Sequence, residues 1–310
     1  MSYEEAVSVI GVTKRYGEAA ALDAISLQVA PGAVTALLGP NGAGKTTMIR
    51  ILSTLLRPDA GSARVAGFDV VAERDQVQAL IGLAGQSLSV DGRLSGPENL
   101  AMFGRLHRLS WPAVRQRSAA LLEIFDLTKA GKKAVKTYSG GMRRKLDLAI
   151  SLLAEPRILF LDEPTTGLDP ASRHALWDII RGLVSRGTTV LLTTQYLDEA
   201  DALAKDVVFI NAGRVVATGT PAELKARVGQ AQFELIAASD ADLALVASAL
   251  SRFSPAVDAG QLTVRVAVRG LAQVSAITAA AARAGADVSQ FALHEPDLDD
   301  VYFQLTRRAA

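Results

Sequence analysis

The sequence contains no cysteine, which excludes a disulfide framework and a thiolate metal site. No apolar run approaches the length of a membrane span. Positive and negative charges are nearly balanced, since the sequence has 33 lysines and arginines and 32 aspartates and glutamates. This balance removes the usual electrostatic reason to expect a nucleic-acid partner. The N-terminus, with Glu4 and Glu5, lacks the basic and then apolar pattern of a signal peptide. We therefore expect a soluble cytoplasmic protein.

A glycine-rich stretch at residues 39–47, GPNGAGKTT, fits the phosphate-loop pattern G-x-x-x-x-G-K-[ST]. Residues 34–38 before it are predicted to form a buried strand, and residues 48–53 after it a helix. The alternative is a glycine-rich turn that matches by accident, and these flanks argue against it. Lys45 is expected to reach the β- and γ-phosphates of a nucleotide, and the Thr46 hydroxyl to ligate Mg²⁺. The predicted nucleotide-binding residues of the loop are Gly39, Pro40, Asn41, Gly42, Ala43, Gly44, Lys45, Thr46 and Thr47.

Two adjacent acids follow a second apolar stretch. Residues 158–161, ILFL, are predicted to form a strand that is buried on both faces, as in a parallel sheet. Ligands of open α/β sheets bind at the carboxyl ends of the strands. Asp162 at that end is expected to hold Mg²⁺, and Glu163 to accept a hydrogen bond from an attacking water and polarise it. Two solvated turn acids are the alternative, which is a poor fit after so apolar a strand.

Three further positions are ambiguous from the residues alone. Tyr16 could stack on a nucleotide base, and the alternative is a half-buried tyrosine at a strand end. Gln86 follows a predicted strand, where its amide oxygen suits Mg²⁺ or an attacking water, although most such glutamines are solvated. Ser139, followed by Gly140 and Gly141 at a helix start, is either an anion-binding design or an ordinary serine cap.

The pattern of apolar residues changes along the chain. Three stretches, 97–109, 112–125 and 142–153, have helical spacing and predict a helical insertion within an α/β core. Residues 230–310 give strand and helix patterns in the order β-α-β-β-α-β, which is ferredoxin-like, with a final helix at 298–307. That segment shows no catalytic constellation, and we expect a dimer-stabilising or regulatory module there.

With these segments in order, residues 6–228 resemble an ABC-type ATPase. The matching motifs are Walker A (GPNGAGKTT), the signature (YSGGM), Walker B (LFLDEP) and a D-loop, TTGLD, at residues 165–169. The resemblance is closer still to the daunorubicin/doxorubicin-resistance branch of bacterial export ATPases, through YSGGMRRKLD at 138–147, LLTTQYLDEA at 191–200 and PDLDDVY at 296–302.

The resemblance implies an α/β fold with two domains. Residues 1–228 are expected to form a phosphate-loop (RecA-like) ABC ATPase core, with a helical subdomain at about residues 87–155. Residues 229–310 are expected to form a small C-terminal α+β (ferredoxin-like) domain.

The resemblance also assigns roles to the ambiguous positions. It implies that Tyr16 stacks on adenine and that Gln86 ligates the metal and relays to a membrane partner. It implies that the signature grips the γ-phosphate of ATP bound to the other subunit. The residues expected to contact ATP in trans are Ser139, Gly140, Gly141 and Asp169.

One position departs from the wider family. The switch residue, usually histidine, is Gln195 here, as in the drug-resistance branch. Glutamine can hydrogen-bond to a γ-phosphate but cannot take up a proton as imidazole does. We interpret this as a feature of the branch, and we expect Gln195 to act in catalysis together with Glu163.

The sequence therefore predicts the ATP-hydrolysing subunit of a bacterial exporter of a drug, antibiotic or lipid. ATP and Mg²⁺ are the expected cofactors. We expect a head-to-tail homodimer at the cytoplasmic face of the plasma membrane, a separate integral membrane permease as partner, and no nucleic acid. One alternative is a non-transport ABC protein that acts on DNA or ribosomes, but the usual insertions and fused second cassette are missing. The other is an ATP-binding scaffold without turnover, against which the intact Glu163 argues.

Overall fold

The computed structural model describes residues 5–85 and 90–307, and its internal contacts divide the chain into two units, Met1–Pro221 and Ala222–Ala310. The sequence places the boundary after residue 228, which is at the other end of helix α8 (Pro221–Val228). In the structure α8 therefore lies in the second unit, apart from its first residue. Among the described residues, no helix combines the length and the apolar character that crossing a bilayer requires.

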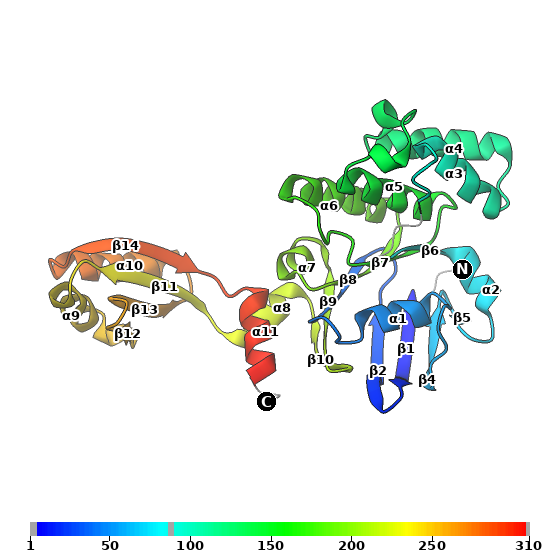
Figure 1. Cartoon of the computed structure of the whole chain (residues 1–310). Coiled ribbons are helices and arrows are strands. Elements are labelled where there is room, and N and C mark those ends of the chain that lie inside the picture. Colours follow the sequence, from blue (N-terminus) through cyan, green and yellow to red (C-terminus); the bar gives the residue numbers. More distant parts are fainter. Residues whose placement is uncertain (1–4, 86–89, 308–310) are drawn as a thin grey trace. The chain divides into compact units, whose positions relative to one another are not determined.

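The centre of the first unit is a six-stranded sheet (Figure 1). Its strand order is β10 (Arg214–Gly219), β9 (Asp206–Asn211), β3 (Val34–Leu38), β8 (Thr189–Thr194), β7 (Ile158–Asp162) and β6 (Ile81–Ala84). All neighbours pair in parallel except β10, which is antiparallel to β9. Every residue of β3, β7 and β8 is buried, which explains their continuous apolar runs. Because parallel strands end at one edge, the loops after β3, β7 and β8 meet there.

A second, antiparallel sheet has the order β2 (Ala19–Val29), β1 (Val7–Tyr16), β4 (Ala60–Val65) and β5 (Phe68–Asp69). Helix α1 (Lys45–Leu52) follows the phosphate loop and contributes to the core that joins the two sheets. Its Met48 and Ile51 are fully buried in one cluster with Leu22 of β2 and Phe160 of β7. This packing fixes the first turn of α1 at the sheet edge.

The three helices predicted between residues 97 and 153 are present as α3 (Gly96–Leu106), α4 (Trp111–Ile124) and α5 (Gly140–Leu152). Short 3₁₀ turns lie at Thr128–Ala130 and Val135–Thr137. The other helices of this unit are α2 (Arg74–Leu80), α6 (Pro170–Val184) and α7 (Leu197–Leu203). Serine or aspartate side chains cap α3, α4, α5 and α6, since each accepts a backbone N–H in the first turn.

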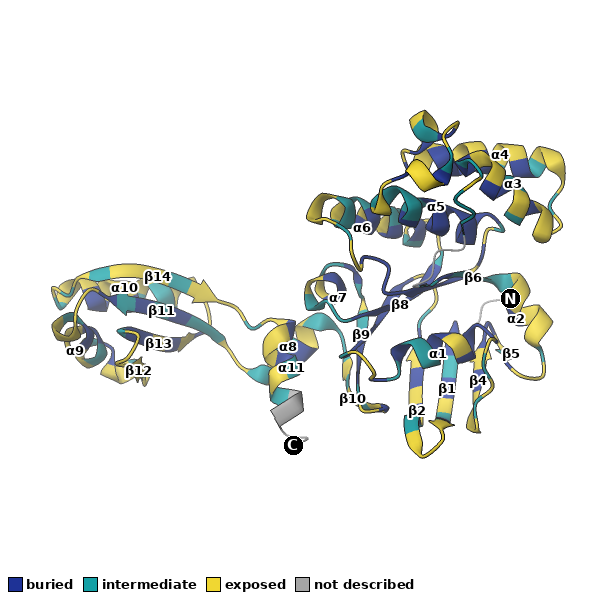
Figure 2. Cartoon of the chain, viewed as in Figure 1, coloured by how far each residue is buried: buried dark blue, intermediate teal, exposed yellow. Residues whose placement is uncertain are grey.

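The second unit contains a four-stranded antiparallel sheet with the order β12 (Ala256–Asp258), β13 (Thr263–Val268), β11 (Ala231–Ala237) and β14 (Val288–His294). Helices α9 (Asp240–Ala249) and α10 (Leu271–Arg283) contribute to its core, and α11 (Leu298–Arg307) ends the described chain. In Figure 2 much of β11 and β13 is coloured as buried. Leu235, Val264 and Val266 of these strands belong to one core cluster with Val246 and Ile277 of the helices.

Candidate functional site

A cavity of about 510 Å³ opens over the phosphate loop at the carboxyl edge of the central sheet. Apart from Ala21 of β2, its lining comes from three segments that are far apart in the sequence, those that follow β3, β7 and β8. The lining residues are Ala21, Asn41, Gly42, Ala43, Gly44, Lys45, Thr46, Thr47, Glu163, Thr166 and Gln195. The structure thus brings the predicted loop residues together with both residues that were expected to act in catalysis.

The phosphate loop needs glycine at two positions. Gly44, the residue before α1, has a φ of +107°, and a Cβ atom there would lie 2.4 Å from the Ala21 carbonyl oxygen. A Cβ on Gly39 would lie 2.1 Å from the Ile210 carbonyl oxygen. The loop therefore lies directly against β2 and β9, and Lys45, Thr46 and Thr47 at the start of α1 line the cavity.

Lys45 is buried beneath the loop. Its Nζ donates to the carbonyl oxygens of Gly39 at 2.7 Å and Pro40 at 3.1 Å. The same Nζ lies 3.5 Å from Oε1 of Glu163. The loop carbonyls and the carboxylate together place the ammonium group between the phosphate loop and the end of β7.

Asp162 and Thr46 lie side by side. Thr46 Oγ1 donates to Oδ1 of Asp162 at 3.2 Å, and Thr193 Oγ1 of β8 donates to the same oxygen at 2.5 Å. The hydroxyl of Thr46 and the carboxylate of Asp162 are hard oxygen donors of the kind that Mg²⁺ prefers. Among the described residues, no three histidine, aspartate or glutamate side chains gather into a metal cage, so an ion here would need phosphate and water oxygens as well.

Glu163 is held in an unusual backbone conformation. Its φ is +48°, in the left-handed region that a non-glycine residue adopts at a cost of roughly 1–3 kcal/mol. Its N–H donates to the carbonyl oxygen and to Oγ1 of Thr193, both at 3.1 Å. Its Oε2 accepts a hydrogen bond from Thr166 at 3.2 Å. These contacts direct the carboxylate into the cavity.

The signature residues lie elsewhere on this chain. Ser139 is exposed and caps α5, because its Oγ accepts from the N–H of Met142 at 3.2 Å. Around Gly140 the space for a Cβ is open. Asp169 caps α6 through Ser172, whose N–H and hydroxyl lower the pKa of the carboxyl group. Neither the signature nor Asp169 lines the phosphate-loop cavity in the described part of the chain.

Three predicted site residues remain, namely Gln195, Tyr16 and Gln86, and the structure describes the first two. Gln195 follows β8 and lines the cavity. Tyr16 ends β1 and is half exposed, and it is not among the lining residues. Gln86 lies outside the described residues.

Sequence reasoning missed three residues of the site. Thr193 supports both acids, and it stands directly opposite Asp162 in the parallel β7–β8 pair. Thr166 was included only within the D-loop. Arg144 of α5 donates to main-chain carbonyls at the end of β7. The role of Thr193 depends on the pairing of β7 with β8, which are distant in the sequence. No pattern in the neighbouring sequence distinguishes Arg144 as a site residue.

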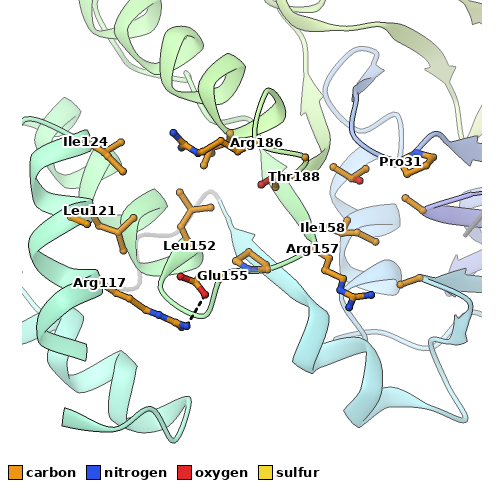
Figure 3. A pocket seen from close by; sticks show the side chains of 17 residues that line it. Pro31, Arg117, Leu121, Ile124, Leu152, Glu155, Arg157, Ile158, Arg186 and Thr188 are labelled. Atoms are coloured by element: carbon orange, nitrogen blue, oxygen red, sulfur yellow. Dashed lines mark hydrogen bonds and ion pairs between the residues drawn. The ribbon is translucent and has the colours of Figure 1, made fainter. Parts of the chain in front are cut away.

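A larger cavity, of about 830 Å³, lies away from the phosphate loop, between α4 and the beginning of β7 (Figure 3). Leu121, Leu152 and Ile158 make much of its wall apolar. Arg117 is paired with Glu155 at 2.6 Å, and the labelled side chains of Arg157 and Arg186 point in different directions. It contains neither acid of the site, so the smaller phosphate-loop cavity is the candidate for chemistry.

This chain is similar to known proteins over nearly its whole length. A family model described as ABC transporter matches residues 22–166. The daunorubicin resistance ATP-binding protein DrrA3 of Streptomyces coeruleorubidus is 49% identical over 304 residues, covering 98% of this chain and 96% of that protein. The Nod factor export ATP-binding protein I of Ralstonia nicotianae is 36% identical, covering 97% and 94%.

A solved structure of another ABC transporter protein has a similar fold. The structure of cbiO1 from Clostridium perfringens, described as part of the ABC transporter complex cbiONQ, aligns with a TM-score of 0.67 at 25% identity. The alignment covers 72% of this chain and 92% of that one. The likeness to the resistance protein thus extends over both units, while the structural likeness spans about the length of the first.

Proposed function

This chain belongs to the ABC transporter family as an ATP-binding, ATP-hydrolysing subunit, and we propose that it powers the export of a small organic molecule through a separate permease. The observation that carries the proposal is the 49% identity with a daunorubicin resistance protein across 98% of this chain. The name of the second relative, a Nod factor export protein, supports the same direction of transport. We place the subunit at the cytoplasmic face of the plasma membrane, bound to the permease.

Two copies of the chain would form the working ATPase. The γ-phosphate needs cations and N–H donors on several sides, and the chain offers two such groups that lie apart. Lys45 lies in the phosphate-loop cavity, whereas Ser139 begins an exposed helix N-terminus elsewhere. A head-to-tail dimer brings the phosphate loop of one copy against the signature of the other, with Asp169 beside it. Each ATP is then bound between two chains.

Within one such site, each group has a distinct task. Thr46 and Asp162, which already touch, would hold Mg²⁺ with phosphate oxygens and water, and we assign Gln86 to the same ion. Mg²⁺ neutralises charge on the β- and γ-phosphates. Glu163 accepts a hydrogen bond from the attacking water, Gln195 donates one to the γ-phosphate, and Tyr16 stacks on adenine.

Export is tested in cells that contain this chain together with a candidate membrane permease. With both proteins present, we expect cells to accumulate less daunorubicin, measured by its fluorescence. A Lys45→Ala variant is the control and should abolish the difference, because the loop loses its cation for the γ-phosphate. Equal accumulation with the intact chain and with Lys45→Ala would contradict the export of this drug class.

The role of Gln195 gives a separate prediction. Its amide N–H₂ should donate to the γ-phosphate in the closed dimer, so Gln195→Ala should lower turnover by about tenfold or more, since a hydrogen bond to a charged group contributes about 1.5–3 kcal/mol. Steady-state phosphate release at saturating ATP measures this. Equal rates for wild type and Gln195→Ala would show that Gln195 only fills the loop.

The pH–rate profile of ATP turnover should differ between the wild type, with glutamine at position 195, and Gln195→His. The side chain of Gln195 does not ionise, so it should contribute no ionisation to the wild-type pH–rate profile between about pH 6 and 8. Gln195→His should remain active and acquire a histidine-like pH dependence. An unchanged profile in Gln195→His would contradict contact between residue 195 and the γ-phosphate.

A further inference from the structure

One buried arginine contacts three parts of the site at once. Arg144 lies on α5, five residues after Ser139, and is only 8% exposed. Its Nε donates to the Pro164 carbonyl at 2.9 Å, and its Nη2 donates to the carbonyls of Asp162 at 3.0 Å and Glu163 at 3.1 Å. Its Nη1 donates to the carbonyl of Gly85, which directly precedes Gln86. A single guanidinium therefore joins the signature helix to the ends of β7 and β6.

The three successive carbonyls of Asp162, Glu163 and Pro164 form the turn that carries the Glu163 carboxylate. Since the φ of Glu163 is +48°, this turn persists only if its surroundings hold it. Thr193 accepts the Glu163 N–H from one side, and Arg144 donates to the Glu163 carbonyl from the other. The direction of the carboxylate thus depends on where α5 places Arg144.

Several carboxylates surround the charge of Arg144. Its guanidinium lies 3.8 Å from Asp147 on the same helix. Burial lowers the pKa of Arg144, and the carboxylates of Asp147, Asp162 and Glu199 oppose that shift. Glu199, in α7 just after Gln195, is fully buried and accepts from Trp177 at 3.2 Å.

We propose that Arg144 is a positioning residue that couples the two ATP sites of the dimer. The inference rests on the proposed function, in which Ser139 faces ATP held by the partner subunit and Glu163 faces ATP held by its own chain. Binding of the partner's γ-phosphate fixes the N-terminus of α5. Because Arg144 lies on α5 and holds the carbonyls of residues 162–164, the position of α5 sets the turn that orients the Glu163 carboxylate. Each site therefore hydrolyses ATP faster when the other is occupied.

Lysine cannot replace this contact. The guanidinium presents five N–H donors in a planar fork, whereas an ammonium group on a flexible stem has three donors and no plane. Arg144→Lys keeps the positive charge among the acids but lacks the planar fork that reaches the carbonyls of Gly85, Asp162, Glu163 and Pro164 together. Arg143→Lys is the matched control, because within the described residues Arg143 donates to the segment before the signature, at the carbonyls of Tyr138 (3.1 Å) and Lys136 (3.4 Å).

The test measures ATP turnover against ATP concentration, and nucleotide affinity by a fluorescent ATP analogue. For Arg144→Lys we expect kcat to fall by about tenfold or more, while the affinity of the isolated chain stays within about threefold. The Hill coefficient should fall from near 2 in wild type towards 1. Arg143→Lys should keep the wild-type kcat and Hill coefficient, and thermal unfolding checks that both variants are folded.

A second variant removes the side chain. In Arg144→Ala, millimolar guanidinium should restore part of the lost turnover, and methylammonium at the same concentration should not. Rescue by neither cation would count against a positional role. Wild-type kcat and Hill coefficient in Arg144→Lys would overturn the proposal, and a reduced kcat with unchanged cooperativity would overturn the coupling while leaving the proposed function intact. Failure of the proposed function itself would show separately, as equal daunorubicin accumulation with the intact chain and with Lys45→Ala.

Discussion

Glu163→Gln is expected to keep ATP binding and to lower ATP turnover by about 100-fold or more. The amide has the shape of the carboxylate and can still accept the hydrogen bond from Thr166 that the structure shows. It is, however, a far weaker proton acceptor, so the attacking water is no longer polarised. Nucleotide affinity and phosphate release, measured on the same preparation, separate these two effects.

The control for this prediction is Glu155→Gln. Glu155 is an exposed carboxylate that pairs with Arg117, away from the phosphate loop, and its loss should leave turnover unchanged. Wild-type turnover in Glu163→Gln would remove Glu163 from the mechanism. Phosphate release by the wild-type chain in the same assay would exclude the alternative of an ATP-binding scaffold without turnover.

Ser139→Arg is expected to leave ATP binding to a single chain intact and to abolish turnover of the homodimer. Ser139 caps the exposed start of α5, where the N–H groups and the helix dipole favour an anion. A bulky cation at that position would occupy the place of the γ-phosphate of the facing ATP. Lys45→Ala should abolish turnover for a different reason, because it damages the phosphate loop.

Mixing the two inactive variants shows whether a site is shared between chains. In a mixed dimer, one site combines both lesions and the other has an intact phosphate loop and an intact signature. Partial recovery of turnover on mixing is the expected result. Full activity of the Ser139→Arg homodimer would contradict a contact in trans.

A matched substitution controls for damage to the fold. Ser110→Arg changes the capping serine of α4, which accepts from Ala113 as Ser139 accepts from Met142. Either substitution removes a cap worth about 1 kcal/mol. Since only Ser139 is expected to face a nucleotide, Ser110→Arg should retain turnover.

The phosphate loop and the two acids were predictable because their signals are local. A strand, a glycine loop and a helix follow one another at residues 34–53, and the apolar run before Asp162 identifies a buried parallel strand. Membership of the ABC transporter family, predicted from these motifs, is confirmed by the comparisons. The arrangement of the sheet adds the one fact that the motifs lack, namely that the loops after β3, β7 and β8 line a single cavity.

The supporting residues were not predictable from the sequence. Thr193 acts on Asp162 and Glu163 only because β8 pairs with β7 in a particular register. Arg144 is one of three consecutive basic residues at 143–145, and burial alone distinguishes it from an ordinary solvated arginine. The boundary of the second unit differs for a similar reason, since the sequence pattern of α8 does not reveal which unit the helix packs in.

The most direct test of the central claim, that ATP joins two copies of this chain, is the mass of Glu163→Gln in solution. Light scattering after gel filtration, with and without ATP and Mg²⁺, measures it. We predict the mass of one chain without nucleotide and of two chains with ATP and Mg²⁺, and a return to one chain when Ser139→Arg is added to Glu163→Gln. A single-chain mass for Glu163→Gln at saturating ATP would contradict the shared site.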